Sequence, residues 1–393
     1  MLTLHSYPYQ VRAQGAAVSS KWPEKYVIGL TGNIATGKSV VRKMLEHLGA
    51  YGIDADSLSH RAVSRGAPGY QPVVDAFGRW ILNPDGEIDR IKLGKLAFND
   101  VEAMARLEDI VHPLVSQAIN MMIKRATQRV IVIEAIKLLE SDLRNVCDSF
   151  WVVNAPEAVQ MDRLMEKRGM NPDDAAQRLH SQSSQKQKLS AANVIIQNTG
   201  TFEETWKNVT EEWKKIAPKT DTLQMVKTVE GEFSVARGRP RDSAAIAELL
   251  SVLSGGAHKL TPADVMAAFG EKAFLMLRLS GKNVGIAGWQ VENLVARTTE
   301  FFIDPSMPME KALKTLIAEV ERASGDLQCE ASLLFLPPVL AEHQAIWKQL
   351  GYEPRNAKSL GVQAWTDAAI ESDQANTKLF FKQLRQDRVL RPI

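Results

Sequence analysis

The chain has 393 residues, of which 45% are hydrophobic and 24% charged, and its formal net charge is +2. This length is too great for one ordinary core and predicts two domains, with three as the alternative. The small net charge does not point to a nucleic acid or a membrane as a partner. Cys147 and Cys329 match no metal-ligand spacing, which favours buried thiols in a reducing compartment. No apolar run is long enough to span a bilayer and residues 1–24 lack the apolar segment of a signal peptide, so we expect a cytoplasmic protein.

The first part of the chain alternates short apolar runs with helical patterns, which predicts an α/β domain with a buried parallel sheet. Strands are expected at 26–31, 50–54, 130–135 and 149–154. Asn171 followed by proline and two acids predicts a helix start, and the capping box from Thr201 to Glu204 opens a helix that stops before Pro218. These boundaries predict an N-terminal extension at 1–24, to which no function is assigned, and a first domain at 25–218.

Residues 219–232 are polar and lack a period, which predicts a linker before a second domain at 233–393. In this domain we expect a strand at Val235 and a hairpin with strands at 274–279 and 284–291. Further strands are expected at 298–303 and 331–336, and helices at 242–253, 309–323 and 341–350. This order predicts an α+β domain with an antiparallel sheet.

Residues 32–39 match the phosphate-loop pattern G-x-x-x-x-G-K-[ST] at every fixed position. They are Gly32, Asn33, Ile34, Ala35, Thr36, Gly37, Lys38 and Ser39. The predicted strand before them and helix after them favour phosphate binding by backbone amides over an ordinary glycine-rich turn. Lys38 is expected to bridge the β- and γ-phosphates of ATP, and Ser39 to hold Mg²⁺. The chain lacks the N-K-x-D guanine signature of GTPases and a long insertion for mechanical work, so a kinase is favoured.

Asp54 and Asp56 follow the predicted strand at 50–54 and should face the ligand crevice beside the phosphate loop. One carboxylate could accept the proton of a substrate hydroxyl while the other organises Mg²⁺ or water. The alternative is that Asp56 only caps a helix. These residues alone favour neither interpretation.

About residues 25–216 of the sequence resemble the dephospho-CoA kinase family. The family shows an I-D-A-D segment after its phosphate loop, an F-G…D-G…R stretch, an L-x-x-(I/L)-(V/L)-H-P motif and a V-I-x-N-x-G ending. The matching segments are Ile53-Asp54-Ala55-Asp56, Phe77-Gly78 with Gly86 and Arg90, Leu107 to His112-Pro113, and Val194-Ile195-Ile196-Gln197-Asn198-Thr199-Gly200.

The resemblance implies a P-loop NTPase sheet with flanking helices and a lid, and transfer of the ATP γ-phosphate to the ribose 3′-hydroxyl of dephospho-CoA. It assigns Asp56 as the base, with Asp54 beside it in the acceptor site. His112 falls where the family contacts the acceptor, although a structural role at a helix start is the alternative. Among the lid cations, Arg168 and then Arg163 are favoured to neutralise the transferred phosphoryl group. Asn198 and Gly200 belong to the segment that passes near the adenine in related kinases.

Three departures from the family pattern concern the end of the third strand and the lid. Ile136 replaces a proline, Gln185 replaces an arginine and Asn193 replaces an aspartate. Losing the arginine removes a charge-assisted phosphate contact, which Lys186 or Lys188 could replace only as a point charge. Two other functions stay open: a nucleoside or nucleotide kinase, which would share the phosphate loop and lid, and a non-catalytic protein that senses nucleotides or CoA, which the altered lid favours. The sequence gives no oligomeric state.

The second domain resembles GCN5-related N-acetyltransferases in the order of its expected elements. That family binds the acetyl-CoA pyrophosphate with a Q/R-x-x-G-x-G/A turn before a helix. The corresponding residues 304–311 contain no glycine, and Pro305 and Pro308 each remove an N–H donor. Tyr352 could be a general acid, but packing is the favoured role. The domain is interpreted as a degenerate acetyltransferase fold acting in regulation, assembly or binding of CoA compounds.

Overall fold

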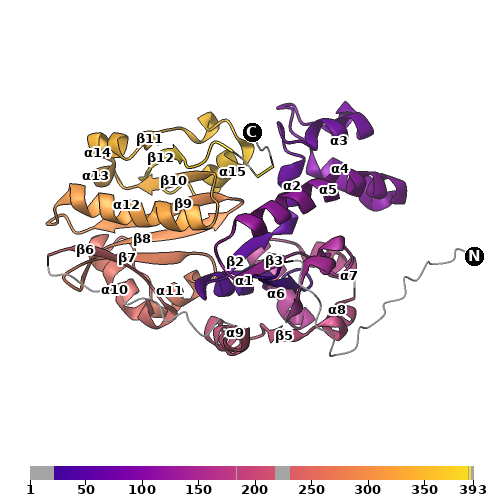
Figure 1. The fold of residues 1–393 in the computed structure, drawn as a ribbon, viewed down its shortest axis with the longest axis horizontal. Coiled ribbons are helices and arrows are strands. Elements are labelled where there is room, and N and C mark those ends of the chain that lie inside the picture. The colour runs from indigo at the N-terminus through magenta and orange to yellow at the C-terminus, as the bar shows by residue number, and fades with distance from the viewer. Residues whose placement is uncertain (1–21, 183, 217–230, 388, 391–393) are drawn as a thin grey trace, which may run out of the picture.

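The computed structural model describes residues 22–390 apart from 183, 217–230 and 388. Two layered units lie side by side: the first domain in indigo to magenta and the second in orange to yellow (Figure 1). The predicted linker and most of the predicted N-terminal extension lie outside the described residues.

The first domain is built on a five-stranded sheet in the order β2-β3-β1-β4-β5, and every strand pair is parallel. The strands are β1 Tyr26–Thr31, β2 Tyr51–Asp54, β3 Val130–Glu134, β4 Ser149–Asn154 and β5 Val194–Gln197. Four of them confirm the strands expected from buried apolar runs. The fifth, β5, was not predicted as a strand because it lies at the sheet edge and alternates exposed with buried residues.

Helices cover both faces of this sheet. They are α1 Lys38–His47, α2 Ala55–Ala62, α3 Tyr70–Phe77, α4 Arg90–Asn99, α5 Val101–Arg125, α6 Glu157–Arg168, α7 Pro172–His180, α8 Gln185–Ala191 and α9 Phe202–Ile216. Helices α1 and α9 pack on one face, and α2 and α5 pack on the other. The predicted helix starts are confirmed: Asn171 accepts the N–H of Asp174, and Thr201 and Glu204 form reciprocal capping bonds.

The second domain has a seven-stranded sheet in the order β11-β12-β10-β9-β8-β7-β6. The strands are β6 Phe233–Arg237, β7 Ala273–Leu279, β8 Lys282–Glu292, β9 Val295–Ile303, β10 Ala331–Leu336, β11 Glu353–Pro354 and β12 Lys378–Gln383. The expectation of an antiparallel sheet is wrong for one pair, because β9 and β10 are parallel. Helix α12, Met309–Asp326, carries the chain back across the sheet between these strands, and a crossover of this length makes a parallel pair.

The other helices of the second domain are α10 Ser243–Leu253, α11 Pro262–Ala268, α13 Pro338–Ala341, α14 Gln344–Gln349 and α15 Gln363–Glu371. The single helix expected at 341–350 is wrong. The backbone leaves the helical region at His343, and the carbonyl of Leu340 accepts the indole N–H of Trp347 at 2.7 Å. Two short helices therefore replace one longer helix.

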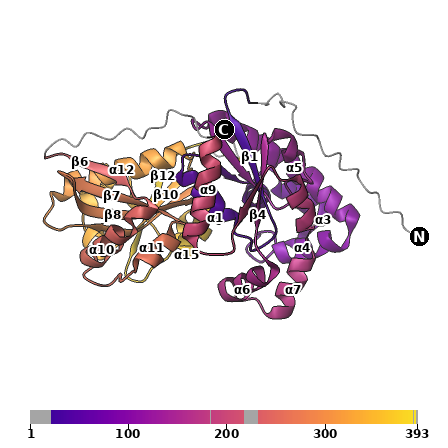
Figure 2. The same cartoon turned by 90° about the horizontal axis from the view of Figure 1, so that it is seen from below.

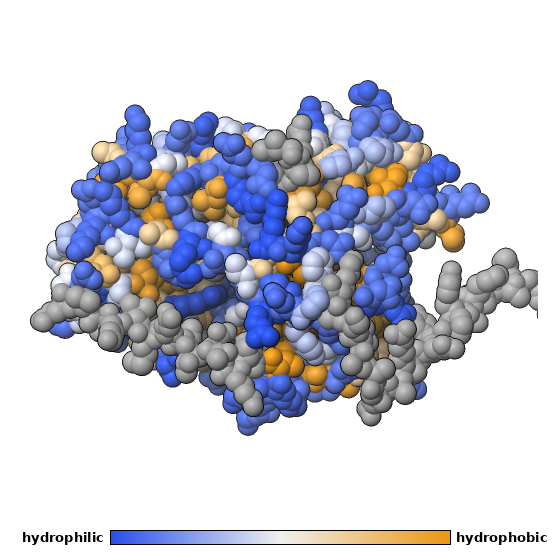
Figure 3. Space-filling view, in the orientation of Figure 1, coloured by the Kyte–Doolittle hydropathy of each residue, from blue (hydrophilic) through white to orange (hydrophobic). Residues whose placement is uncertain are grey.

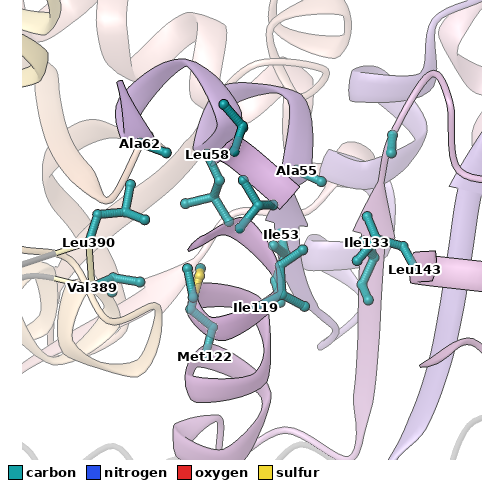
Figure 4. Close-up of a cluster of buried hydrophobic side chains, with 14 of the residues drawn as sticks. Ile53, Ala55, Leu58, Ala62, Ile119, Met122, Ile133, Leu143, Val389 and Leu390 are labelled. Atoms are coloured by element: carbon teal, nitrogen blue, oxygen red, sulfur yellow. The ribbon is translucent and has the colours of Figure 1, made fainter. Parts of the chain in front are cut away.

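The two domains share a hydrophobic core. Val389 and Leu390, near the C-terminal end, pack in one buried cluster with Ala62 of α2 and Met122 of α5 (Figure 4). The view from below also places the second domain alongside α1 and α9 (Figure 2). The face shown in Figure 3 is mostly hydrophilic with scattered apolar patches, and no helix among the described residues is long and apolar enough to cross a membrane.

Candidate active site

The phosphate loop lies between β1 and α1, as the sequence predicts. Gly37 is the N-cap of α1 and has a φ of 90°, a left-handed conformation that favours glycine. A Cβ atom added there would lie 2.0 Å from Nδ2 of Asn198. That Nδ2 donates to the carbonyl of Thr36 at 2.8 Å, so the structure brings Asn198 directly onto the phosphate loop.

Lid residues contact the N–H groups of this loop. The amide of Asn33 donates to Oε1 of Gln185 at 3.0 Å, and the amide of Ile34 donates to Oε1 of Gln182 at 2.8 Å. Lys188 is buried and donates to Oδ1 of Asn33 and to the carbonyl of Ile136, each at 3.0 Å. Burial lowers the pKa of this lysine. Of the two lysines considered as replacements for the missing arginine, Lys188 is therefore the one that contacts the loop.

We call the part of the site around Ser39, where Mg²⁺ is expected, the metal side. It includes a residue that the sequence analysis missed, Glu134 at the end of β3. Its Oε1 accepts the hydroxyl of Ser39 at 2.8 Å, and its side chain is buried. The signal was present in the sequence as four apolar residues followed by an acid, which places a carboxylate at the carboxyl end of a buried strand.

The donor set fits Mg²⁺ that arrives with a nucleotide. Ser39 and Glu134 supply hard oxygen atoms, which Mg²⁺ prefers. Among the described residues there is no group of three or more His, Cys, Asp and Glu side chains able to hold a metal ion alone. Mg²⁺ ordinarily completes its coordination with substrate phosphates and water, so a protein cage is not required.

Asp54 and Asp56 take different roles at the start of α2. Oδ1 of Asp54 accepts the N–H of Ser57 at 2.8 Å, so Asp54 is the helix cap. The alternative in which Asp56 caps the helix is therefore wrong, because α2 begins two residues earlier than that alternative needs. Asp56 instead accepts the N–H of Ile136 at 3.1 Å through Oδ2.

Asp56 has the electrostatic character of a proton acceptor. Burial, and then the neighbouring Asp54, raise the pKa of Asp56 to about 6. The N–H of Ile136 and the ammonium of Lys38 act in the opposite direction. A carboxylate with a pKa close to neutrality is still ionised at pH 7 but accepts a proton more readily than an ordinary aspartate.

Arg163 lies on the phosphate-loop side of the site. Its guanidinium donates to the carbonyls of Ala35 at 3.1 Å, Thr36 at 3.3 Å and Asn198 at 2.9 Å. These contacts join Arg163 to the backbone of the phosphate loop and of Asn198.

The remaining predicted residues have less defined surroundings. His112 is exposed and lies inside the 25-residue helix α5, so the alternative that it stands at a helix start is wrong. In the described part of the chain, no hydrogen bond or ion pair joins it to Asp54 or Asp56. Gly200 is exposed just before the α9 capping box. Arg168 ends α6, and its side chain lies outside the described residues.

The turn before α12 in the second domain satisfies its own hydrogen bonds. Oδ1 of Asp304 accepts the N–H of Ser306 at 2.9 Å and its hydroxyl at 2.7 Å, and the carbonyl of Asp304 accepts the N–H of Met307 at 3.0 Å. The hydrogen bonds from Ser306 lower the pKa of the Asp304 carboxyl. Pro308 is the N-cap residue of α12. This turn therefore places a carboxylate just before the start of α12.

Tyr352 is buried beside Trp347 and donates its hydroxyl to Oγ of Ser332 at 3.0 Å. Burial raises the pKa of this phenol. A phenol that is enclosed and bound in this way is a packing residue, as expected from the sequence.

The first domain has both halves of a phosphoryl-transfer site, with a phosphate loop on one side and a carboxylate of raised pKa beside the loop lysine on the other. This combination defines a P-loop kinase. A family model described as dephospho-CoA kinase matches residues 26–204.

Curated relatives agree with that match. A dephospho-CoA kinase of Carboxydothermus hydrogenoformans is 40% identical over 194 residues, which are 94% of that enzyme and 48% of this chain. One of Geobacter metallireducens is 42% identical over 192 residues, which are 96% of that enzyme and 48% of this chain. The chain belongs to the dephospho-CoA kinase family, and its first domain is a kinase.

Solved structures resembling part of the chain include a GNAT-family acetyltransferase from Staphylococcus aureus. It is 11% identical with a TM-score of 0.32, and the match covers 39% of this chain and 100% of that protein.

Proposed function

We propose that the first domain phosphorylates the ribose 3′-hydroxyl of dephospho-CoA, using ATP and releasing CoA and ADP. The observation that carries this proposal is the position of Asp56, which accepts the N–H of Ile136 and lies close enough to Lys38 of the phosphate loop for the ammonium to affect its pKa. Asp56 accepts the hydroxyl proton while the ribose oxygen forms a bond to the γ-phosphorus. The bond from that phosphorus to the bridging oxygen breaks, and ADP leaves with the bonding electrons.

The phosphate loop binds the nucleotide through its backbone amides, and Lys38 interacts with the β- and γ-phosphates. Ser39 and Glu134 would hold Mg²⁺, which when bound neutralises negative charge on these phosphates. Ser39 and Glu134 already lie within hydrogen-bond distance, so their oxygen atoms are close before any ion binds.

Four further residues complete the proposed site. Asn198 and Arg163 are proposed to hold the phosphate loop in place beside the nucleotide, because both donate to the carbonyl of Thr36 in that loop. Arg168 is proposed to approach the transferred group from the lid, and His112 to contact the acceptor from α5.

A test of this function is ADP release by the full-length protein with Mg²⁺-ATP and one acceptor at a time. Dephospho-CoA, adenosine and a nucleoside monophosphate are the acceptors, and the Lys38→Met variant measures contaminating kinases. We expect turnover with dephospho-CoA alone. Preferred turnover of adenosine or the monophosphate would instead indicate a nucleoside or nucleotide kinase. ATP binding without turnover of any acceptor would indicate a sensing protein.

We infer that the second domain does not transfer acetyl groups and instead supports or regulates the kinase. Asp304 supports this inference, because its carboxylate would repel a pyrophosphate at the start of α12. The enclosed hydroxyl of Tyr352 is also unsuited to protonating a leaving thiolate. Acetyl-CoA added to the same full-length protein, with a panel of primary amines, should release no free thiol above the uncatalysed rate. Saturable thiol release would contradict the inference.

A further inference from the structure

A buried cluster of five charged side chains lies behind the phosphate loop. Its members are Arg42, Lys43, Glu46, Asp54 and Glu134, and we call it the Arg42 cluster. Nε of Arg42 donates to Oε2 of Glu134 at 2.7 Å, and NH1 donates to Oε1 of Glu46 at 2.6 Å. NH2 lies 3.9 Å from Oδ2 of Asp54. The guanidinium of Arg42 therefore contacts Glu134, Asp54 and Glu46 at the same time.

Glu134 joins this cluster to the metal side. One of its carboxylate oxygens accepts Ser39, and the other accepts Arg42. A carboxylate held at both oxygens has a defined orientation, whereas one held at a single oxygen can rotate. The orientation of Glu134 toward Ser39 therefore depends on Arg42.

Lys43 joins the cluster to the second domain. Its ammonium donates to Oε2 of Glu46 at 2.8 Å and to the carbonyl of Val291 in β8 at 2.8 Å. A small cavity of about 40 Å³ lies at the same junction, lined by Arg42, Glu46 and Asp54 from the first domain and by Val291 and its neighbours from the second. A continuous set of contacts thus runs from Ser39 to the second domain.

The charges of the cluster support an ordered site. Burial alone would raise the pKa of Glu46, but Lys43 and Arg42 lower it to about 2, so this carboxylate stays ionised. The Arg42 cluster contains two basic and three acidic side chains. The excess of acidic groups favours a cation bound by Ser39 and Glu134. Buried charges with several partners hold one geometry better than exposed pairs do.

We propose that Arg42 is a positioning residue for the metal side of the kinase site, and that Lys43 makes this positioning depend on the docked second domain. The hydrogen bond from Arg42 holds Glu134 in the orientation that contacts Ser39. Lys43 bonds both to Glu46 and to β8, and Glu46 in turn fixes the position of Arg42. The proposal rests on the proposed kinase function, but its test does not require an acceptor or turnover.

The experiment measures equilibrium binding of a fluorescent, non-hydrolysable ATP analogue to the full-length protein, in Mg²⁺ and in EDTA. The Arg42→Met/Glu46→Gln variant removes both charges of one pair, which avoids leaving Glu46 ionised without Arg42. We expect the strengthening of binding by Mg²⁺ to fall roughly 10- to 100-fold, as for other residues that orient metal ligands. Binding in EDTA should be unchanged. Arg42→Lys should restore part of the effect, because lysine keeps the charge but lacks the fork.

The matched control is Lys272→Met/Glu300→Gln, which removes a largely buried ion pair inside the second domain. We expect this variant to keep the wild-type Mg²⁺ effect. The proposal is overturned if the Arg42 variants keep that effect, or if the control loses it equally. Lys43→Met should lower the strengthening of binding by Mg²⁺ about threefold, as expected for one lost hydrogen bond. An unchanged Mg²⁺ effect in this variant would show that the positioning does not depend on the second domain. If wild type shows the Mg²⁺ effect but phosphorylates no dephospho-CoA, the proposed function fails while the role of Arg42 stands.

Discussion

Asp54 and Asp56 are two residues apart but make different hydrogen bonds. One carboxylate oxygen of Asp54 accepts the N–H of Ser57, whereas Asp56 accepts the N–H of Ile136, two residues after the end of β3. The sequence could not separate them, because either aspartate is suited to cap a helix. The difference depends on β3, which lies about eighty residues further along the chain.

Replacing Asp56 by asparagine tests its role as the base. We expect kcat to fall by roughly 10²-fold or more, since the amide cannot accept the proton. For wild type, kcat/KM should fall as the pH drops through about 6, because protonation of Asp56 below its pKa removes the acceptor lone pair. A steady-state pH profile measures both effects.

Stability provides a check on that variant. The pKa of Asp56 is raised in the folded protein, so ionised Asp56 opposes folding as the pH rises through about 6. Asp56→Asn should therefore be at least as stable as wild type at pH 8, measured by thermal melting. The exposed Asp142→Asn serves as the control with normal kcat. Near-normal turnover of Asp56→Asn would reject the base assignment.

At the scale of elements, the starts of helices α7 and α9 could be predicted from the sequence. Asn171 and the Thr201–Glu204 box act locally, so their patterns hold whatever the rest of the fold does. The contacts of the residues that follow α7 could not be predicted from the sequence. Gln182 and Gln185 meet the phosphate loop about 150 residues away, through bonds that only the folded sheet brings together.

Removing these two glutamines should strengthen ATP binding. Their side chains accept N–H groups of Asn33 and Ile34, which an incoming phosphate would use. The Gln182→Ala/Gln185→Ala variant should bind ATP about tenfold more tightly, as two neutral hydrogen bonds no longer compete. Calorimetric titration with ATP measures this, and the exposed Gln187→Ala is the control. Weaker binding in the double variant would mean that the glutamines help to hold ATP.

At the scale of the whole molecule, the two domains are joined by buried polar contacts as well as by the shared core. Glu330 is fully buried, and it accepts NH2 of Arg61 at 2.7 Å and the N–H of Val389 at 3.0 Å. Nε2 of Gln328 also donates to the carbonyl of Met122 at 2.8 Å. These contacts favour a molecule that unfolds as one unit.

Arg61→Met should disrupt this unit. Glu330 would keep a buried charge without its cationic partner, which costs about 3–5 kcal/mol. Differential scanning calorimetry should show one transition for wild type and a separate, lower transition in the variant. Arg322→Met removes two ion pairs of an exposed arginine on α12, and it should change the free energy of unfolding by less than about 1 kcal/mol. An unchanged single transition in Arg61→Met would show that the domains do not depend on this contact.

The sequence by itself determined the phosphate loop, four strands of the first sheet and most elements of the second domain. These features depend on local chemistry: glycine conformations, capping side chains and the burial of apolar runs. Tertiary structure alone decided the parallel pairing of β9 with β10, the division of tasks between Asp54 and Asp56, and the place of Glu134. It also decided that Arg42 joins the metal side to a second domain. Each of these depends on contacts between residues far apart in the chain, and burial gives such contacts their strength.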